Sequence, residues 1–186
     1  FTDITEGLIR PRYRNDTMQT RTQMLEPLFL DGLFDIPEYQ RGYAWGTSQL
    51  DDLIDDLRYL PENRTHFFGN VILDEDEEPY TTESGRQLPV YRVVDGQQRL
   101  TTALILLDVL SEFDETVSAA LEEANLVQLP GDRPRLMPQG QDGEFFRDCV
   151  LGSMRPDAST PSQTRLEDAR DHFRVQVDEL TDEVSP

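Results

Sequence analysis

Residues 91–102 read YRVVDGQQRLTT, and the pattern of the chain changes within them. Val93–Val94 suits a buried strand, and Gly96 permits a positive φ or a close backbone approach. From Leu100 to Leu110 apolar residues recur at helical spacing. The stretch therefore predicts a strand, a tight turn and a helix that begins just after Gly96.

The start of this helix is a candidate anion site. Unpaired N–H groups and the positive end of the helix dipole gather there, and residues 97–99 add two Gln and one Arg side chain as donors. A phosphate would fit this place. A purely structural reading stays open, in which Asp95 caps the helix, Gly96 is a turn residue and Arg99 is a surface cation or pairs with an acid.

The chain of 186 residues carries a formal net charge of −20, and every one of its 17 basic residues is Arg. Abundant Asp and Glu without Lys resemble the composition of proteins from salt-loving archaea. Such a charge opposes long-range attraction to nucleic acid but leaves room for a local basic site. Because counterion release drives DNA binding only weakly in high salt, a DNA contact would depend on stacking and charge-assisted hydrogen bonds.

Residues 38–45, EYQRGYAW, form the second informative stretch. They place two Tyr, the only Trp, a Gln and an Arg between an expected strand and an expected helix. Aromatic faces beside an Arg fork suit stacking on a base and binding of a phosphate. The alternative is that Tyr43 and Trp45 hold the loop to the core while Arg41 pairs with a carboxylate.

Few other residues point to chemistry. Cys149 is the single cysteine, so no internal disulfide can form, and its apolar neighbours indicate core packing. The two histidines, His66 and His172, show no zinc spacing. No long apolar run predicts a membrane span, and residues 1–21 show no apolar signal-peptide core, so we expect a cytoplasmic protein without a membrane partner.

Local patterns predict the remaining elements. Residues 1–21 read as an arm, and residues 67–73 as a buried strand in which Gly69 marks a bulge or a close approach. Asp142 can cap a helix that runs to about residue 151. Further helices are expected over residues 23–29, 47–60, 115–125 and 164–180, and a further strand over 34–37.

With these pieces placed, the chain resembles the N-terminal, ParB/sulfiredoxin-like domain of GmrSD- and SspE-type modification-dependent restriction proteins. The matching motifs are IPEYQRGYAW at 36–45, FGNVIL at 68–73 and above all DGQQRLTT at 95–102. Weaker agreement continues through residues 135–138, Asp142 and Phe146, so the likeness covers about residues 22–183. The resemblance implies an α+β fold, a small mixed β-sheet flanked by helices with a helical C-terminal extension.

The resemblance also implies a domain order. Residues 1–21 would be the arm, 22–130 the ParB-like domain that binds a nucleoside triphosphate (NTP) and senses DNA, and 131–186 a helical extension. That extension would lead toward an HNH-type nuclease domain. We therefore expect no nuclease activity from these 186 residues themselves. The family link further implies a role in phage defence.

Carried over by position, the DGQQR turn would bind and hydrolyse GTP or another NTP. The implied catalytic residues are Asp95, Gln97, Gln98 and Arg99, and the implied nucleotide-binding residues are Gly96, Arg99, Leu100, Thr101, Thr102 and Arg41. Asp95 would hold Mg²⁺, directly or through water, or would orient the attacking water; the two roles stay open. Gln97 or Gln98 would position water.

The implied DNA-sensing residues are Tyr39, Gln40, Arg41, Tyr43 and Trp45, and the DNA would be a duplex carrying phosphorothioate or a modified base. Whether Arg41 serves the nucleotide or the DNA is left open. Two other functions compete with the NTPase: a non-catalytic reader of modified DNA, and an acidic adaptor that docks a partner subunit. A homodimer is also compatible with the sequence.

Overall fold

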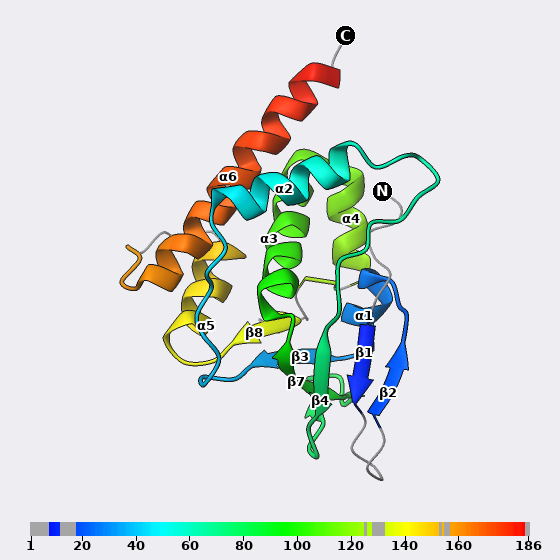
Figure 1. Cartoon of the computed structure of the whole chain (residues 1–186). Helices are drawn as coiled ribbons and strands as arrows, with labels where there is room; N and C mark the ends of the chain where they lie inside the picture. Colours follow the sequence, from blue (N-terminus) through cyan, green and yellow to red (C-terminus); the bar gives the residue numbers. More distant parts are fainter. Residues whose placement is uncertain are drawn as a thin grey trace.

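Helix α3 (Gln97–Phe113) stands at the centre of the protein, above a β-sheet and between other helices (Figure 1). The computed structural model describes residues 8–11, 18–124, 126–127, 133–152, 154 and 157–184. Residues 100–106 are all buried, so this part of α3 is enclosed by the rest of the protein. It packs against α6 (Pro161–Val184) and against α4 (Glu115–Ala124).

A six-stranded mixed sheet lies below α3 in Figure 1. Its strands, in spatial order, are β2 (Met18–Arg21), β1 (Leu8–Pro11), β4 (Ile72–Glu75), β7 (Val90–Asp95), β3 (Leu33–Ile36) and β8 (Leu136–Pro138). Strand β3 pairs in parallel with β7 and with β8, whereas β4 and β7 are antiparallel. A small mixed sheet flanked by helices, with a C-terminal helix, confirms the predicted α+β class.

Shorter elements complete the fold. They are α1 (Leu25–Asp31), α2 (Thr47–Arg58), the two-stranded sheet of β5 (Tyr80–Thr81) and β6 (Gln87–Leu88), α5 (Gln141–Phe145) and the π-helical turn Phe146–Val150. One apolar core gathers side chains from the helices and from one face of the sheet. Its largest fully buried side chains are Phe29, Phe34, Phe146 and Phe173.

Two parts of the chain differ from the sequence prediction at the edge of the sheet. We expected an arm over residues 1–21, but Leu8–Pro11 and Met18–Arg21 form the antiparallel pair β1 and β2; the rest of that arm lies outside the described residues. Ile9 of β1 pairs in parallel with Ile72 of β4. The pair covers the edge that β4 would otherwise expose to solvent. This pairing is the physical reason why these residues form strands instead of an arm.

The strand expected over residues 67–73 begins later, at Ile72. Gly69 has a φ of +97°, and the backbone oxygen of Asn70 accepts a hydrogen bond from Arg99 rather than from a neighbouring strand. This segment therefore runs as a loop into β4 and brings Gly69 and Asn70 to the first turn of α3. A register shift between Ile72 and Leu73 accompanies the change.

Residues on both sides of the boundary between 130 and 131, where we placed the start of the helical extension, contribute to one sheet and one core. Strand β8 lies beside β3, and α6 packs on α3 and on α2. Buried Leu166 and Phe173 of α6 belong to the same core as Leu100 of α3.

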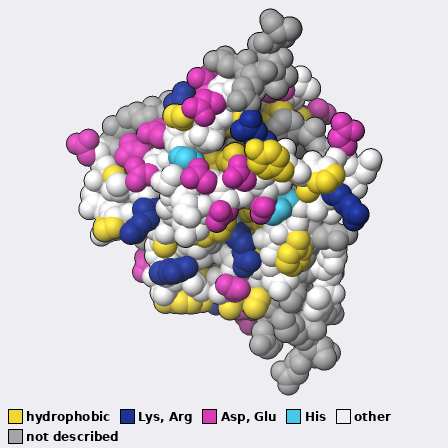
Figure 2. Space-filling model, turned by 45° about the horizontal axis from the view of Figure 1, so that its top comes forward, with side chains coloured by type: hydrophobic (Ala, Val, Ile, Leu, Met, Phe, Trp, Pro, Cys, Tyr) yellow, Lys and Arg dark blue, Asp and Glu magenta, His cyan; other side chains and the backbone are white. Residues whose placement is uncertain are grey.

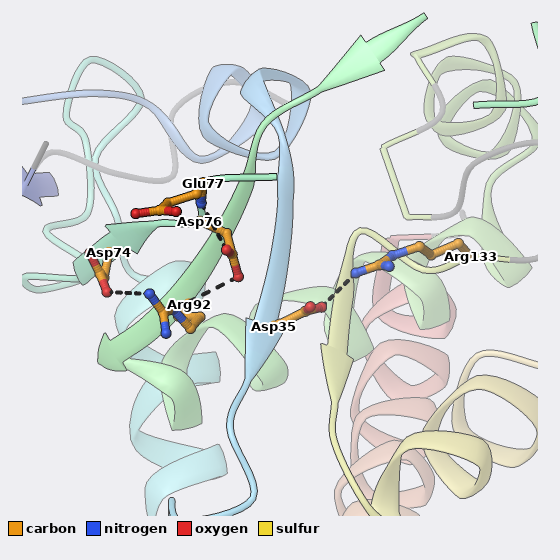
Figure 3. Close-up of polar contacts among 6 residues, drawn as sticks. All are labelled: Asp35, Asp74, Asp76, Glu77, Arg92 and Arg133. Carbon is orange, nitrogen blue, oxygen red and sulfur yellow. Dashed lines mark hydrogen bonds and ion pairs between the residues drawn. The ribbon is translucent and has the colours of Figure 1, made fainter. Parts of the chain in front are cut away.

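The sheet face opposite the main core carries a row of charges (Figure 3). Arg92 of β7 has Asp35 of β3 and Asp74 of β4 as cross-strand neighbours. Its guanidinium lies 2.9 Å from the Asp74 carboxylate, and Arg133 lies 2.6 Å from the Asp35 carboxylate. Burial raises the pKa of Asp35 and is the largest influence on it. The Arg133 cation opposes the rise, and repulsion by Asp76 adds a smaller contribution in the upward direction.

Acidic side chains spread over the face of the protein seen in Figure 2. Asp51, Asp52, Asp55 and Asp56 are exposed on α2. The two histidines contact this helix, since His172 lies 2.8 Å from Asp51 and His66 lies 3.8 Å from Asp56. Within the described part of the chain, no helix is both long enough and apolar enough to cross a membrane.

Candidate functional site

The junction between β7 and α3 has the predicted form. Gly96 is buried with a φ of +93°, and a Cβ there would lie 2.8 Å from Cγ2 of Val71 and 3.1 Å from the Asn70 oxygen. Glycine is required both for the backbone conformation and for this close approach. The residue at the helix N-cap is Gly96 itself, without a side-chain cap, so the reading of Asp95 as a cap is wrong.

Asp95 and Arg99 lie together on the side of α3 that faces the loop before β4. The Arg99 guanidinium donates to the Asn70 oxygen at 2.8 Å and lies 3.8 Å from the mostly exposed Asp95 carboxylate. A Cβ on Gly69 would come within 2.1 Å of Arg99 Nη1. Arg99 is therefore packed against the Gly69–Asn70 backbone, which explains the close approach expected at Gly69.

Gln97 and Gln98 turn toward the 38–45 loop. Both are buried, with 8% and 9% of their surface exposed. Nε2 of Gln97 donates to the Arg41 oxygen at 3.1 Å. Nε2 of Gln98 donates to the Gly42 oxygen at 3.2 Å, and its Oε1 accepts from the Ala44 N–H at 2.7 Å. The two amides thus hold the backbone of the loop against the first turn of α3.

Tyr43 adds a third contact between the loop and α3. Its hydroxyl lies 2.7 Å from Oγ1 of Thr102. Because the Thr102 hydroxyl already donates to the Gln98 oxygen, the Tyr43 hydroxyl is the donor. Burial raises the pKa of Tyr43 well above its ordinary value, so the phenol stays protonated. The reading in which Tyr43 anchors the loop to the core is the one that the contacts support.

The other predicted DNA-sensing residues are more open to solvent. Tyr39 is 77% exposed, and Gln40 donates to the Val94 oxygen at 3.0 Å. Trp45 is half-buried and packs against the core. Arg41 is exposed, and its guanidinium makes no hydrogen bond or ion pair with any described residue.

The loop and the first turn of α3 line one cleft with a volume of about 390 Å³. Its lining residues are 36–38, 40–43, Gln97, Gln98, Thr101 and 138–142. Arg41 is the only cation among the described residues that line it, beside the carboxylates of Glu38 and Asp142. Asp95 and Arg99 do not line this cleft, so the two groups of predicted residues fall on different sides of α3.

Two residues that we assigned to the nucleotide have other surroundings. Leu100 is fully buried in the core, and its N–H donates to the Gly96 oxygen at 3.1 Å. Thr102 is also fully buried and uses its hydroxyl on Gln98 and Tyr43. Thr101 is buried as well, but it does line the cleft.

Residues 138–142 also line the cleft, although we did not predict from the sequence that they belong to the site. Asp142 was expected to cap a helix, but α5 begins at Gln141 with Gly140 at its N-cap. The Asp142 carboxylate instead accepts hydrogen bonds from Ser162 and from Thr160. Two local signals were present: Gly140, which has a φ of +72°, and the acidic residue two positions after it.

A Mg²⁺ ion would need ligands beyond the side chains at Asp95. No group of three or more His, Cys, Asp or Glu residues in the described part of the chain could hold a metal ion. A Mg²⁺ ion commonly takes one or two carboxylates and completes its shell with water and substrate phosphate oxygens. The exposed Asp95 carboxylate fits that pattern only as one ligand of several.

Comparison with known families decides the class of the domain. The family model described as "GmrSD restriction endonuclease, N-terminal domain" matches residues 25–182. The chain belongs to this family. A search of curated proteins found no match. As a GmrSD N-terminal domain, the chain has its place in restriction and so in defence against foreign DNA, and both the 38–45 loop and the DGQQR turn lie within the matched residues.

Proposed function

We propose that this GmrSD N-terminal domain binds and hydrolyses an NTP and couples that activity to the sensing of modified DNA. The single observation that carries the proposal is the cleft of about 390 Å³, which is lined at once by the 40–43 loop and by the first turn of α3. A cleft of roughly 300 Å³ or more can take a small ligand.

The chemistry of the cleft supports a phosphate ligand. The first turn of a 17-residue helix, where the positive end of its dipole lies, lines the cleft together with Arg41. The Arg41 guanidinium makes no hydrogen bond or ion pair with any residue that the structure describes. Glu38 and Asp142 oppose a polyanion there, so a triphosphate would need the positive charge of bound Mg²⁺ in addition to Arg41. Arg41 is therefore assigned to the nucleotide phosphates.

Asp95 and Arg99 take a different part in this proposal. Neither residue lines the cleft: Arg99 contacts Asn70, and Asp95 lies near Arg99, so Arg99 supports the turn from another side of α3. Asp95 keeps its two alternative roles, as one Mg²⁺ ligand or as the group that orients water. A long nucleotide that bends over the N-terminus of α3 could reach both sides.

The sensing half of the proposal rests on the exposed end of the same loop. Tyr39 offers a free aromatic face on which a base can stack, and Gln40 lies beside it. The amides of Gln97 and Gln98 join this loop to α3. DNA bound at Tyr39 would therefore change the position of the groups that bind the nucleotide.

The direct test measures nucleotide binding and phosphate release for the four common NTPs with Mg²⁺, at low and high salt, with and without phosphorothioate duplex. Asp95→Ala and Arg99→Ala should lower phosphate release, with exposed Asp52→Ala as the matched control. Tyr39→Ala should abolish the response to DNA, with Tyr59→Ala, 73% exposed, as its control. Absence of both binding and hydrolysis in all conditions would reject the enzymatic half.

A non-catalytic reader of modified DNA is the second candidate. It is favoured by one observation: the side chains of Gln97, Gln98 and Arg99 are all engaged in contacts within the protein. Binding of modified duplex that is lost in Tyr39→Ala and is unaffected by any nucleotide would support this reader. Equal affinity for modified and plain duplex would count against sensing in either form.

A further inference from the structure

The first turn of α6 contacts two walls of the cleft, the 40–43 loop and Asp142, without lining the cleft itself. The N–H of Tyr43 donates to Oγ of Ser162 at 2.7 Å, across 119 positions of sequence. The Ser162 hydroxyl in turn donates to the Asp142 carboxylate, which also accepts from Thr160. A continuous chain of hydrogen bonds thus runs from the cleft wall, through α6, to the loop that carries Arg41.

The packing around this chain is tight. A Cβ on Gly42 would lie 2.6 Å from Ser162 Oγ and 3.3 Å from the Asp142 carboxylate, so only glycine lets the loop approach so closely. Buried Gln163 holds the turn from the other side, because its Nε2 donates to the Gln141 oxygen at 3.0 Å and its Oε1 accepts from the Ser159 N–H at 2.8 Å.

The Arg41 loop is therefore held between two helices. From α3 it receives the amides of Gln97 and Gln98; from α6 it receives the Ser162 hydroxyl. The helices are joined further along by buried Arg170 of α6, which forms ion pairs with Asp108 and Glu112 of α3. The position of the loop thus depends on how α6 sits against α3.

We propose that Ser162, oriented by Asp142, is a positioning residue that sets Arg41 for the phosphates in the cleft. This inference rests on the proposed function for the ligand and on the contacts above for the mechanism. Ser162 does not itself line the cleft, so it would act on the nucleotide only through the loop. Because linkage is reciprocal, phosphate bound at Arg41 also stabilises the position of α6 that keeps the Ser162 contact.

The test compares four variants, one each at Ser162 and Thr164 and two at Asp142, in two measurements. Ser162→Ala removes the hydroxyl, and Thr164→Ala is its control, since the exposed Thr164 hydroxyl donates to the oxygen of Thr160, just before α6, and to no other residue that the structure describes. The first measurement is acrylamide quenching of Trp45, the only tryptophan, which lies two residues after Tyr43. The second is the dissociation constant of the NTP that the wild type binds most tightly.

Ser162→Ala should increase the quenching of Trp45 without ligand and weaken nucleotide binding by about threefold to tenfold, the worth of one hydrogen bond. Thr164→Ala should change neither. Asp142→Asn, which keeps a hydrogen-bond acceptor, should fall between the wild type and Asp142→Ala in the quenching of Trp45. Nucleotide affinity is not compared for the Asp142 variants, because loss of this carboxylate also removes its repulsion of the phosphates in the cleft. Circular dichroism of each variant separates a local effect from loss of the fold.

Each outcome has one meaning. Quenching of Ser162→Ala that equals that of Thr164→Ala overturns the positioning role, whatever the nucleotide does. Altered quenching with unchanged nucleotide affinity also overturns it, because the loop then moves without consequence for the ligand. If the wild type binds no NTP, the proposed function fails, and the quenching alone decides whether Ser162 holds the loop.

Discussion

The Oε1 atom of Gln98 accepts a hydrogen bond from the N–H of Ala44 at 2.7 Å, although 54 positions separate the two residues. The Nε2 atom of the same side chain donates to the Gly42 oxygen. A residue of the DGQQR turn therefore clamps the backbone of the second motif. Gln98 therefore has a structural role in holding the loop, which is separate from any role in positioning water.

Replacing Gln98 should loosen the loop. Gln98→Ala leaves the half-buried Ala44 N–H without its partner, and we expect the free energy of unfolding to fall by roughly 1–3 kcal/mol. Urea denaturation measures the change, and Gln87→Ala, exposed on β6, is the control. A loss no larger than that of Gln87→Ala would show that the clamp contributes little.

Removing the Tyr43 hydroxyl should lower the free energy of unfolding by less than Gln98→Ala does. Tyr43→Phe deletes one buried hydrogen bond to Thr102, with an expected loss of about 1 kcal/mol in the free energy of unfolding. Because burial raises the pKa of the Tyr43 phenol, it should remain protonated at pH ~10, the ordinary pKa of a tyrosine side chain. The phenolate absorbance of wild type and Tyr43→Phe should then coincide near that pH. An earlier rise in the wild type would contradict the burial.

The raised pKa of Asp35 predicts that the stability of the protein depends on pH. Its pKa is raised in the folded protein, so its favourable contribution is complete below 3.8, its ordinary value, and is lost as the pH rises through the folded pKa. Asp35→Asn cannot ionise. Its free energy of unfolding relative to wild type should therefore improve from acidic to neutral pH in urea denaturation. A relative stability that declines over this range would reverse the sign and refute the prediction.

Alanine substitutions at two glycines with positive φ distinguish the cost of backbone strain from the cost of displacing Arg99. Gly85 has a φ of +80° and open space around it, so Gly85→Ala should cost only the strain, about 1–2 kcal/mol. Gly69→Ala has similar strain at +97°, but its Cβ would also push Arg99 away from Asn70. We expect a larger loss of stability in Gly69→Ala.

The same pair tests the role of Arg99 in the proposed hydrolysis. If Arg99 acts from its place beside Gly69, phosphate release should fall in Gly69→Ala in the same direction as in Arg99→Ala. Gly85→Ala should retain it. Normal phosphate release in Gly69→Ala would mean that the observed position of Arg99 has no part in the reaction.

Local sequence patterns predicted the helices and strands better than they predicted which residues these elements contact. Helix α3 and strand β7 follow from the spacing of apolar residues and from Gly96, which acts within a few positions of chain. The strand expected from Phe67 failed because its apolar residues lead into a loop whose Asn70 oxygen is taken by Arg99. A hydrogen bond between residues that are far apart in the sequence leaves no periodic pattern of apolar residues by which it could be predicted.

The sequence by itself determined the α+β class, the strand-turn-helix at Gly96 and the family that the chain belongs to, because each depends on residue types at short, regular spacing. The tertiary structure alone decided which of these residues share a cleft. It placed Arg41 beside Gln97 and Asp142, and it set Asp95 and Arg99 on another side of α3. The physical reason is that the cleft is built from side chains on separate elements, whose meeting depends on how α3, α6 and the sheet pack together.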